Sequence, residues 1–564
     1  ALSLTWTVRW RSVHLGTMSA TAAAEEEMKL EGLKPEEVHR LLETACASGA
    51  VAGVEAILST PQGRAAARMR NPAGRTVLHA CLGNPNMEAV LLLLLKCEEG
   101  REIAAEADSF GCTAVHRCCT TGSTTALREL LKIDAARAVV GSTSHSQGSP
   151  VHFACRSNNA GALELLLQYP EARATLCTSG STTGHLTTPL LIAAAIGKAA
   201  PLVRMILDLP EGRESLSICA SEGTARTSVL HVAARKGNAE VIREIVKHEE
   251  GRQLALQQDG QGETPLMLAC LHSGSEAVTA LLEFEEGIEA IPILDSREMS
   301  ALFAACQSQK DATALALLDK LEAAKLINVA GAIGGGPMHR ACSRGFDRVV
   351  RKMIEYDEGR DAVLELDSTG WAPLHIACSI GAAAVVDELL GIEEGVRSMV
   401  FETSSTKDTT LALASDRGHF EVVERIIGLP EGLTLVGKVN PVTLRTAMHA
   451  ACSPLDPRAL GVLLDTNEGV KAALLQDAKG WTALHLAADE GRHKHAAMLL
   501  EACGGDELGS LQSKKGETAL HVALRREEEE VAMAIIAATT PLTWMLRDER
   551  GRTAQEVAVS SGLL

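Results

Sequence analysis

The sequence predicts an all-α solenoid of stacked helix pairs, and three observations support this fold class. One motif recurs: Gly480–Ala488 reads GWTALHLAA, Gly370–Cys378 reads GWAPLHIAC, and Glu517–Ala523 reads ETALHVA. Alignment on the position of His485 finds fifteen copies at intervals of 35 to 40 residues. Each copy also carries the local signals of two short helices. A fixed period of this length indicates an array in which each unit packs on its neighbours.

The aligned positions are Glu43, His79, His116, His152, Leu191, His231, Met267, Phe303, His339, His375, Ala412, His449, His485, His521 and Glu556.

Each unit begins with a turn and continues into two helices. In one unit Asp259–Gly262 forms the turn, Thr264 is the expected N-cap and Pro265 the first helical residue. The Thr hydroxyl can accept an unpaired N–H, and Pro has no N–H to lose. In the preceding unit the first helix ends at Gly237, because a left-handed cap favours a residue without Cβ. Its second helix has apolar residues at helical spacing between Val241 and Val246.

The motif Thr-Pro-Leu-His-x-Ala-Ala, the Gly-terminated first helix and a Val-Val-x-x-Leu-Leu second helix resemble the ankyrin-repeat family, from about Pro35 to Leu564. The resemblance implies an all-α ankyrin-repeat solenoid with short hairpin fingers between the helix pairs. It implies protein–protein recognition along a concave surface of fingers and first helices. It further implies that the His at the aligned position bonds to the Thr of its own turn and to nearby backbone.

One regular feature departs from the family. Ankyrin units usually span about 33 residues, whereas most intervals here are 36 or 37. The extra length follows the second helix, where Glu-Gly-Arg recurs, as in Glu250–Arg252 and Glu358–Arg360, with an apolar residue shortly afterwards, such as Leu254 and Val363. We expect an added helical turn or a longer finger base, buried through the apolar residue. We interpret Glu-Gly-Arg as a surface segment whose recurrence reflects duplication.

The chain is expected to form one solenoid over residues 33–564, with atypical capping units at 33–68 and 547–564. Residues 1–32 are expected to be disordered. Ala1–Ala24 contains Arg and Trp but no Asp or Glu, which is typical of an organellar transit peptide. The alternative interpretation is that Met18 is the true start and that the preceding residues are upstream translation.

Composition excludes several classes of partner. The formal net charge of −18 disfavours nucleic acid and anionic lipid, which need an electropositive face. No apolar run reaches the length of about 18 residues that a membrane span needs, so no membrane insertion is expected. The 15 cysteines indicate a reducing compartment. We therefore predict a cytoplasmic location, with an organellar one as the alternative if the N-terminal segment is a transit peptide.

The recurring His and Cys residues are interpreted as packing residues. Neighbouring units lie roughly 10 Å apart, too far for two His to bind one zinc ion. Many cysteines follow the aligned position by three residues, where other units have Ala, so Cys serves there as a slightly larger Ala. His493 and His495 are read as a solvated patch. Gly331–Gly336 lacks the Lys-Ser/Thr of a phosphate-binding loop. We expect no catalytic residue, metal, cofactor or small-molecule substrate.

Candidate partner-binding residues come from the fingers and from the first helices. The two longest intervals, 39 and 40, fall among three fingers rich in Ser, Thr and Gly, over residues 141–149, 178–188 and 217–228. These fingers either form a contact surface or reflect drift in tolerant loops. Family resemblance also places on the concave surface the Trp after the finger Gly and the two residues after the Ala-Cys pair. The candidates are Trp371, Trp481, Arg235, Lys236, Arg344, Asp489, Glu490, His145, Ser181, Thr182 and His185.

These observations predict a non-enzymatic scaffold or adaptor that binds a protein partner along the surface of fingers and first helices. One alternative is a substrate-recognition or regulatory module of a larger enzyme or channel assembly whose other domain is absent from this sequence. Another is a structural subunit of a large complex.

Overall fold

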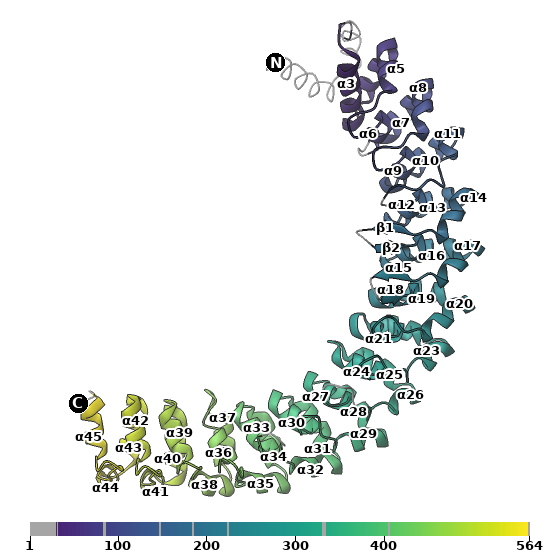
Figure 1. The fold of residues 1–564 in the computed structure, drawn as a ribbon. Coiled ribbons are helices and arrows are strands. Elements are labelled where there is room, and N and C mark those ends of the chain that lie inside the picture. Colours follow the sequence, from purple (N-terminus) through teal and green to yellow (C-terminus); the bar gives the residue numbers. More distant parts are fainter. Residues whose placement is uncertain are drawn as a thin grey trace. The chain divides into compact units, whose positions relative to one another are not determined.

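The computed structural model describes residue 30 and residues 32–82, 86–145, 148–182, 185–222, 225–329, 334–403 and 406–561. The expected disordered segment, the transit-peptide hypothesis and Met18 therefore lie almost wholly outside the described residues. By its internal contacts the chain divides into two units, Ala1–Ala290 and Ile291–Leu564. From here on we call these two parts unit 1 and unit 2, and we use the word repeat for a single set of helices. Each unit is built from the same three-helix repeat (Figure 1).

Unit 1 contains first, second and third helices, short 3-10 turns and four strands. Its first helices are α3 (Pro35–Ser48), α6 (Val77–Cys81), α9 (Ala114–Thr121), α12 (Pro150–Arg156), α15 (Pro189–Ala195), α18 (Val229–Lys236) and α21 (Pro265–His272). Its second helices are α4 (Val51–Ser59), α7 (Met87–Lys96), α10 (Thr124–Leu130), α13 (Ala160–Leu166), α16 (Ala200–Leu207), α19 (Ala239–Val246) and α22 (Ser275–Leu281). Its third helices are α5 (Pro61–Ala67), α8 (Glu98–Glu102), α11 (Asp134–Arg137), α14 (Pro170–Arg173), α17 (Pro210–Glu214), α20 (Glu249–Gln253) and α23 (Glu285–Glu289). The 3-10 turns are η2 (Ile103–Ala105), η3 (Ala174–Cys177), η4 (Ser215–Ser217) and η5 (Leu254–Leu256), and the strands are β1 (Gly180–Thr182), β2 (His185–Thr187), β3 (Ala220–Glu222) and β4 (Ala225–Thr227).

Unit 2 repeats the arrangement and ends on a first helix. Its first helices are α24 (Ala301–Gln307), α27 (Pro337–Arg344), α30 (Pro373–Ile380), α33 (Thr410–Asp416), α36 (Ala447–Ala450), α39 (Ala483–Asp489), α42 (Ala519–Arg526) and α45 (Ala554–Ser561). Its second helices are α25 (Asp311–Leu318), α28 (Asp347–Ile354), α31 (Ala383–Leu390), α34 (Phe420–Ile427), α37 (Arg458–Leu464), α40 (His493–Cys503) and α43 (Glu529–Ala538). Its third helices are α26 (Leu321–Ala324), α29 (Asp357–Ala362), α32 (Glu393–Met399), α35 (Pro430–Val436), α38 (Asn467–Ala473), α41 (Gly505–Gly509) and α44 (Pro541–Trp544).

The predicted repeat is confirmed, because each of the fifteen aligned positions falls within a first helix. The predicted caps are present as well. Thr264 Oγ1 accepts the backbone N–H of Met267 at 3.3 Å, and Gly237 ends α18 in the left-handed region at φ 72°. Within each unit, first helices pack on first helices and second helices on second helices, as α18 does on α21 and α19 on α22. Their facing Ala, Leu, Val and Cys side chains form the core.

The predicted helical turn after the second helix is present as the third helix. Its Glu residues begin the helix and its Arg lies in the last turn, which matches the helix dipole. Gly251 is buried, however, so the interpretation of the whole Glu-Gly-Arg segment as surface is wrong. A Cβ at Gly251 would lie 2.0 Å from the carbonyl oxygen of Ile245, the penultimate residue of α19. In α8, Arg101 Nε donates to the carbonyl of Leu95 at 2.7 Å. The motif therefore packs the third helix on the end of the second.

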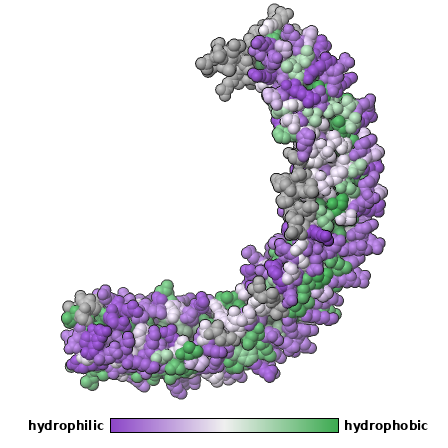
Figure 2. All heavy atoms as spheres, viewed as in Figure 1, coloured by the Kyte–Doolittle hydropathy of each residue, from purple (hydrophilic) through white to green (hydrophobic). Residues whose placement is uncertain are grey.

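Each finger precedes a first helix, and we call the side of a unit formed by fingers and first helices the finger face. In Figure 1 the third helices of unit 1 lie on the side opposite its strands. On the face in view in Figure 2, hydrophilic residues predominate and apolar residues occur in separate patches. No helix in the part of the chain that the structure describes is long and apolar enough to cross a membrane.

Candidate partner-binding surfaces

The recurring His joins its own finger to the next one. His485 Nδ1 accepts the backbone N–H of Thr482 at 3.2 Å and lies 2.9 Å from Thr482 Oγ1. Because Nδ1 accepts, the proton is on Nε2, which donates to the carbonyl of Glu517 at 3.0 Å. His152 makes the corresponding bond to Thr178 at 3.1 Å in unit 1. The local bond was implied by family resemblance, whereas the bond to the following repeat was not predicted.

Burial fixes the charge state of these residues. It lowers the pKa of His152 and His485 to about 4, so both rings are neutral near pH 7. Burial also raises the pKa of the Cys81 and Cys155 thiols to about 12, which keeps them protonated. Among the described residues, no three His, Cys, Asp or Glu side chains are placed to hold a metal ion together. These side chains are therefore used within the fold.

His493 and His495 do not form the solvated patch expected from the sequence. His493 is half exposed, and its Nδ1 lies 3.0 Å from Glu530. His495 is buried, with 1% of its surface exposed, and burial lowers its pKa to about 4. Residues two apart on a helix point to different faces, and here one face is the core. The interpretation was therefore wrong for His495.

Several finger turns of unit 2 are closed by a buried Asp side chain. Asp477 Oδ1 accepts the backbone N–H of Lys479 at 2.7 Å and of Trp481 at 3.0 Å. Asp548 does the same for Arg550 at 2.9 Å and Arg552 at 2.8 Å. Such an Asp turn holds the two central residues of the finger outward. The Asp side chain therefore positions the finger tip through backbone N–H groups, whatever side chains the two central residues carry.

Backbone hydrogen bonds also link successive fingers of unit 2. The N–H of Ala478 donates to the carbonyl of Thr443 at 2.9 Å. The N–H of Lys514 donates to Lys479 at 3.0 Å, and that of Glu549 donates to Lys515 at 2.8 Å. We call the four fingers joined in this way, residues 440–445, 477–481, 513–517 and 548–552, the basic finger row. Its tips are therefore held one repeat apart.

Unit 1 has a shorter row of the same kind and a small sheet. The N–H of Ser109 donates to Ala73 at 3.1 Å, and that of His145 donates to Phe110 at 2.9 Å. The next two fingers lengthen into strands that pair antiparallel in the order β1-β2-β3-β4. The two hairpins meet where Leu186 is paired with Ser221. We call β1–β4 the finger sheet.

The two predicted Trp residues are half-buried against first helices. The ring centroid of Trp481 lies 6.3 Å from that of His485, with the planes 24° apart. Trp371 and His375 are 6.4 Å apart. Lys479 Nζ lies 5.5 Å from the Trp481 ring centroid, within cation–π range. Each indole is therefore held within its own repeat and also presents surface on the finger face.

The charged candidates on the first helices differ in how much they are used internally. Asp489 forms a bidentate pair with Arg526 of the next repeat, at 2.5 and 2.9 Å. Glu490 lies 3.4 Å from Arg492. Arg344 is exposed and donates to the carbonyl of Gln307 at 2.9 Å. Both acidic candidates thus contribute to ion pairs.

The remaining candidates lie in unit 1. Arg235 is half-buried and Lys236 is exposed, both in the last turn of α18. His145 is exposed at the tip of its finger. The backbone of Ser181 and Thr182 belongs to β1 and that of His185 to β2, with Thr182 paired to His185. The side chains of these last three residues lie outside the described part of the structure.

Sequence reasoning missed the charged tips of the basic finger row. Lys479 lies between the Asp and the Gly of its turn, and Lys514, Lys515 and Arg550 occupy the corresponding central positions. All four are exposed. The sequence signal was the basic residues at the two central positions of each turn. The structure shows that these two positions face outward.

Comparison with known proteins agrees with this architecture. The family model for ankyrin repeats in three copies matches residues 42–139, 190–291, 230–330, 338–433 and 411–508, which together cover more than half of the chain. No curated protein matches the chain.

Two solved structures are similar to parts of the chain. One is described as the Bd0816 predatory endopeptidase from Bdellovibrio bacteriovorus in complex with immunity protein Bd3460, at 24% identity and a TM-score of 0.30, covering 35% of this chain and 95% of that one. The other is the ankyrin repeat domain of Bcl-3, at 22% identity and a TM-score of 0.33, covering 42% of this chain and 96% of that one. Similarity at these identities and TM-scores does not indicate which partners this chain binds. The match of the family model over most of the chain, together with the repeat seen in the structure, shows that the protein belongs to the ankyrin-repeat family.

Proposed function

We propose that the protein is a non-enzymatic scaffold or adaptor that binds one or more partner proteins along its finger face. One observation carries this proposal. The residues that recur between repeats are buried and bonded within the fold, whereas many residues that differ between repeats are exposed on fingers held by backbone hydrogen bonds. A rigid support that presents variable side chains is what a recognition surface requires.

Several features support a protein partner in a reducing compartment. The net charge of −18 opposes extended contact with nucleic acid or anionic lipid. No disulfide joins the described cysteines, which fits a cytoplasmic location. Long arrays of this kind offer an extended surface on which a partner can contact several repeats at once.

The finger sheet offers a direct test. Residues 178–188 would be shortened to the length of an ordinary finger, and proteins bound to the wild type and to the variant would be compared by affinity purification and quantitative mass spectrometry. We expect specific partners to be lost, because the shortened finger can no longer form β1 and β2. Far-UV circular dichroism should be unchanged, since fingers carry little of the core.

A matched control places an equal disturbance on the opposite side. Glu249 and Glu285 are exposed on the third helices α20 and α23. The double variant Glu249→Lys/Glu285→Lys should keep the wild-type set of partners. Loss of partners from this control, together with retention by the shortened finger, would contradict binding along the finger face.

A further inference from the structure

The tips of the basic finger row carry positive charge that the fold does not neutralise. We call Lys479, Lys514, Lys515 and Arg550 the basic tips. All four are exposed, and within the described residues none forms an ion pair with an acid. Lys479 instead lies over the Trp481 ring. Glu549 is the acidic residue among these tips, so the row is locally cationic although the chain is strongly acidic.

Apart from Glu549, the acids of the same fingers are turned inward and paired. Asp477 and Asp548 are 4% and 6% exposed, because their carboxylates close the finger turns. Glu517 lies 3.2 Å from Arg525, and Asp548 lies 2.8 Å from Arg552. Apart from Glu549, the acids of these fingers are thus paired at the finger bases, whereas the basic side chains remain exposed at the tips.

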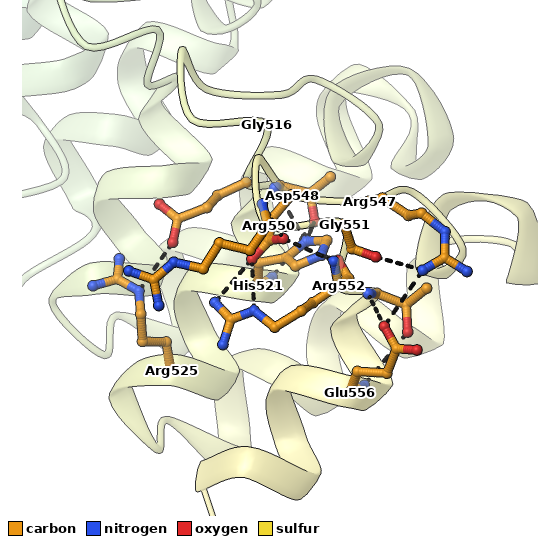
Figure 3. Close-up of polar contacts among 12 residues, drawn as sticks. Gly516, His521, Arg525, Arg547, Asp548, Arg550, Gly551, Arg552 and Glu556 are labelled. Atoms are coloured by element: carbon orange, nitrogen blue, oxygen red, sulfur yellow. Dashed lines mark hydrogen bonds and ion pairs between the residues drawn. The ribbon is translucent and has the colours of Figure 1, made fainter.

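The last two repeats gather guanidinium groups beside the row. Figure 3 shows the side chains of Arg525, Arg550 and Arg552 extending to the same side of the close-up, around His521. Arg547 extends to the other side, where it lies 3.5 Å from Glu556. Among the described residues, Arg550 is the arginine of this group that forms no ion pair with an acid. Planar guanidinium groups favour carboxylates because they can bind both oxygens.

From this arrangement we propose that the basic finger row binds an extended acidic segment of a partner protein. The proposal rests on the function proposed above and names the chemistry of one partner. Successive tips are held one repeat apart, at roughly 10 Å. An extended chain in the polyproline II conformation has three residues per turn and rises about 3.1 Å per residue, so every third side chain lies on one face, about 9 Å from the next. Carboxylates at every third residue would therefore meet Lys479, the Lys514–Lys515 pair and Arg550 in turn.

The neighbouring residues favour a protein segment over nucleic acid. Trp481 presents half-exposed aromatic surface beside Lys479, which suits an apolar side chain between the acids. The cationic stretch is short, and the chain as a whole has a net charge of −18. Exposed charges are screened beyond about 8 Å at physiological ionic strength. A short acidic segment gains the local attraction, whereas a long polyanion would also meet the surrounding acidic surface.

The test uses the full chain and a labelled peptide of about fifteen residues, with Asp or Glu at every third position and Pro and Leu between, so that the peptide favours the polyproline II conformation. Fluorescence anisotropy would measure its affinity at low salt for the wild type and for Lys514→Glu/Lys515→Glu. Exposed charge pairs are worth up to about 1 kcal/mol each, so we expect the double variant to bind roughly tenfold more weakly. Added salt should weaken wild-type binding.

The matched control reverses two exposed lysines elsewhere in unit 2. The variant Lys325→Glu/Lys471→Glu makes the same change in net charge away from the row. It should bind the acidic peptide with near wild-type affinity. Equal weakening in both variants would overturn the proposal, because it would reveal a response to net charge alone. Tighter binding of a single-stranded oligonucleotide of equal charge would also overturn it.

The two proposals fail in different ways. If the peptide does not bind but the shortened finger at residues 178–188 still loses specific partners, the acidic-segment inference is wrong and the proposed function stands. If Lys514→Glu/Lys515→Glu does not weaken peptide binding and the shortened finger keeps all partner proteins, both the acidic-segment inference and the proposed function are wrong. All four basic tips are exposed, so circular dichroism should show that the charge variants remain folded.

Discussion

In unit 1 two neighbouring fingers lengthen into the paired strands of the finger sheet, whereas in unit 2 four fingers of ordinary length are linked by single backbone hydrogen bonds. Both arrangements fix finger tips in a row. The finger segments of unit 1 are rich in Ser, Thr and Gly, and those of unit 2 expose Lys and Arg. The backbone of this repeat therefore determines where the finger tips lie, and the local sequence determines what the tips can bind.

The hydrogen bonds from the recurring His residues to the next repeat, which we call the His bridges, should respond to pH in the same way in both units. This is the largest effect that we expect. The unfolded pKa of His is about 6.5, and burial lowers the folded pKa of His152 in unit 1 and His485 in unit 2 to about 4. The unfolded chain therefore binds more protons between these values. Stability should be full above about pH 6.5 and fall as pH decreases toward 4, by up to about 3 kcal/mol for one such His.

Urea unfolding between neutral pH and about pH 4.5 would measure this loss. Trp371, Trp481 and Trp544 all lie in unit 2, so Trp fluorescence follows mainly that unit among the described residues, whereas far-UV circular dichroism follows both. We expect both midpoints to move down together. A fluorescence midpoint that stays constant while the circular dichroism midpoint falls would separate the units.

The third-helix glycines should be equally critical in both units. A Cβ at Gly251 would lie 2.0 Å from Ile245 O, and one at Gly432 would lie 1.8 Å from Ile426 O. We expect Gly251→Ala and Gly432→Ala each to cost about 3 kcal/mol of unfolding free energy, since backbone must move. Gly437→Ala is the control, because nothing lies within 4 Å of its Cβ. Unfolding midpoints equal to that of the control would refute the packing role.

Substitution of the finger glycines should disturb the backbone hydrogen bonds between successive fingers, which we call the finger links, in one row at a time. A Cβ at Gly480 would lie 2.6 Å from Lys514 N, and one at Gly111 would lie 3.1 Å from His145 N. Gly551 has a similar φ of 74° with no such neighbour. Ala at Gly551 should cost about 1 kcal/mol for its backbone conformation. Ala at Gly480 or Gly111 should cost about 1–2 kcal/mol more, as measured by urea unfolding.

Equal losses at Gly480, Gly111 and Gly551 would show that the finger links contribute nothing to stability. A larger loss of stability at Gly480 than at Gly111 would show that the finger link of unit 2 contributes more to stability. We expect this order because the contact in unit 2 is the closer of the two.

The smallest effect is expected for the core cysteines. Cys155 in unit 1 and Cys378 in unit 2 are fully buried where other repeats have Ala234 and Ala488, which are also fully buried. Cys155→Ala and Cys378→Ala should each cost about 1 kcal/mol or less. Native-state alkylation should leave both thiols largely unmodified, because they are inaccessible and protonated. Failure of either variant to fold would contradict a simple packing role.

The fold could be predicted from the sequence because its signals are local and repeat many times. Turn residues, N-caps and helical spacing recur in every repeat, so errors at one position are corrected by the others. Contacts between repeats were not visible in this way. The pairing of Asp489 with Arg526, 37 residues away, depends on how neighbouring helices stack, and so does the pairing of Leu186 with Ser221.

Two errors had signals that were present in the sequence. The Gly of Glu-Gly-Arg recurs at a fixed distance from the second helix, which indicates steric need rather than duplication alone. His493 and His495 point to different faces, so a single interpretation could not hold for both. Whether the chosen finger-face residues bind a partner stays a prediction, because binding is a property of two molecules.

The His bridge also gives the array mechanical properties. Most of the recurring His residues donate across a repeat boundary, as His449 does to Trp481 at 3.0 Å, so tension applied along the chain loads these bonds in series. A repeat that yields would release about 36 residues, or roughly 120 Å of extended chain at about 3.4 Å per residue. Under a pulling force, each unit should lengthen in regular steps of about this size and shorten again when the force is removed. A bound partner that spans several fingers would raise the force needed for each step.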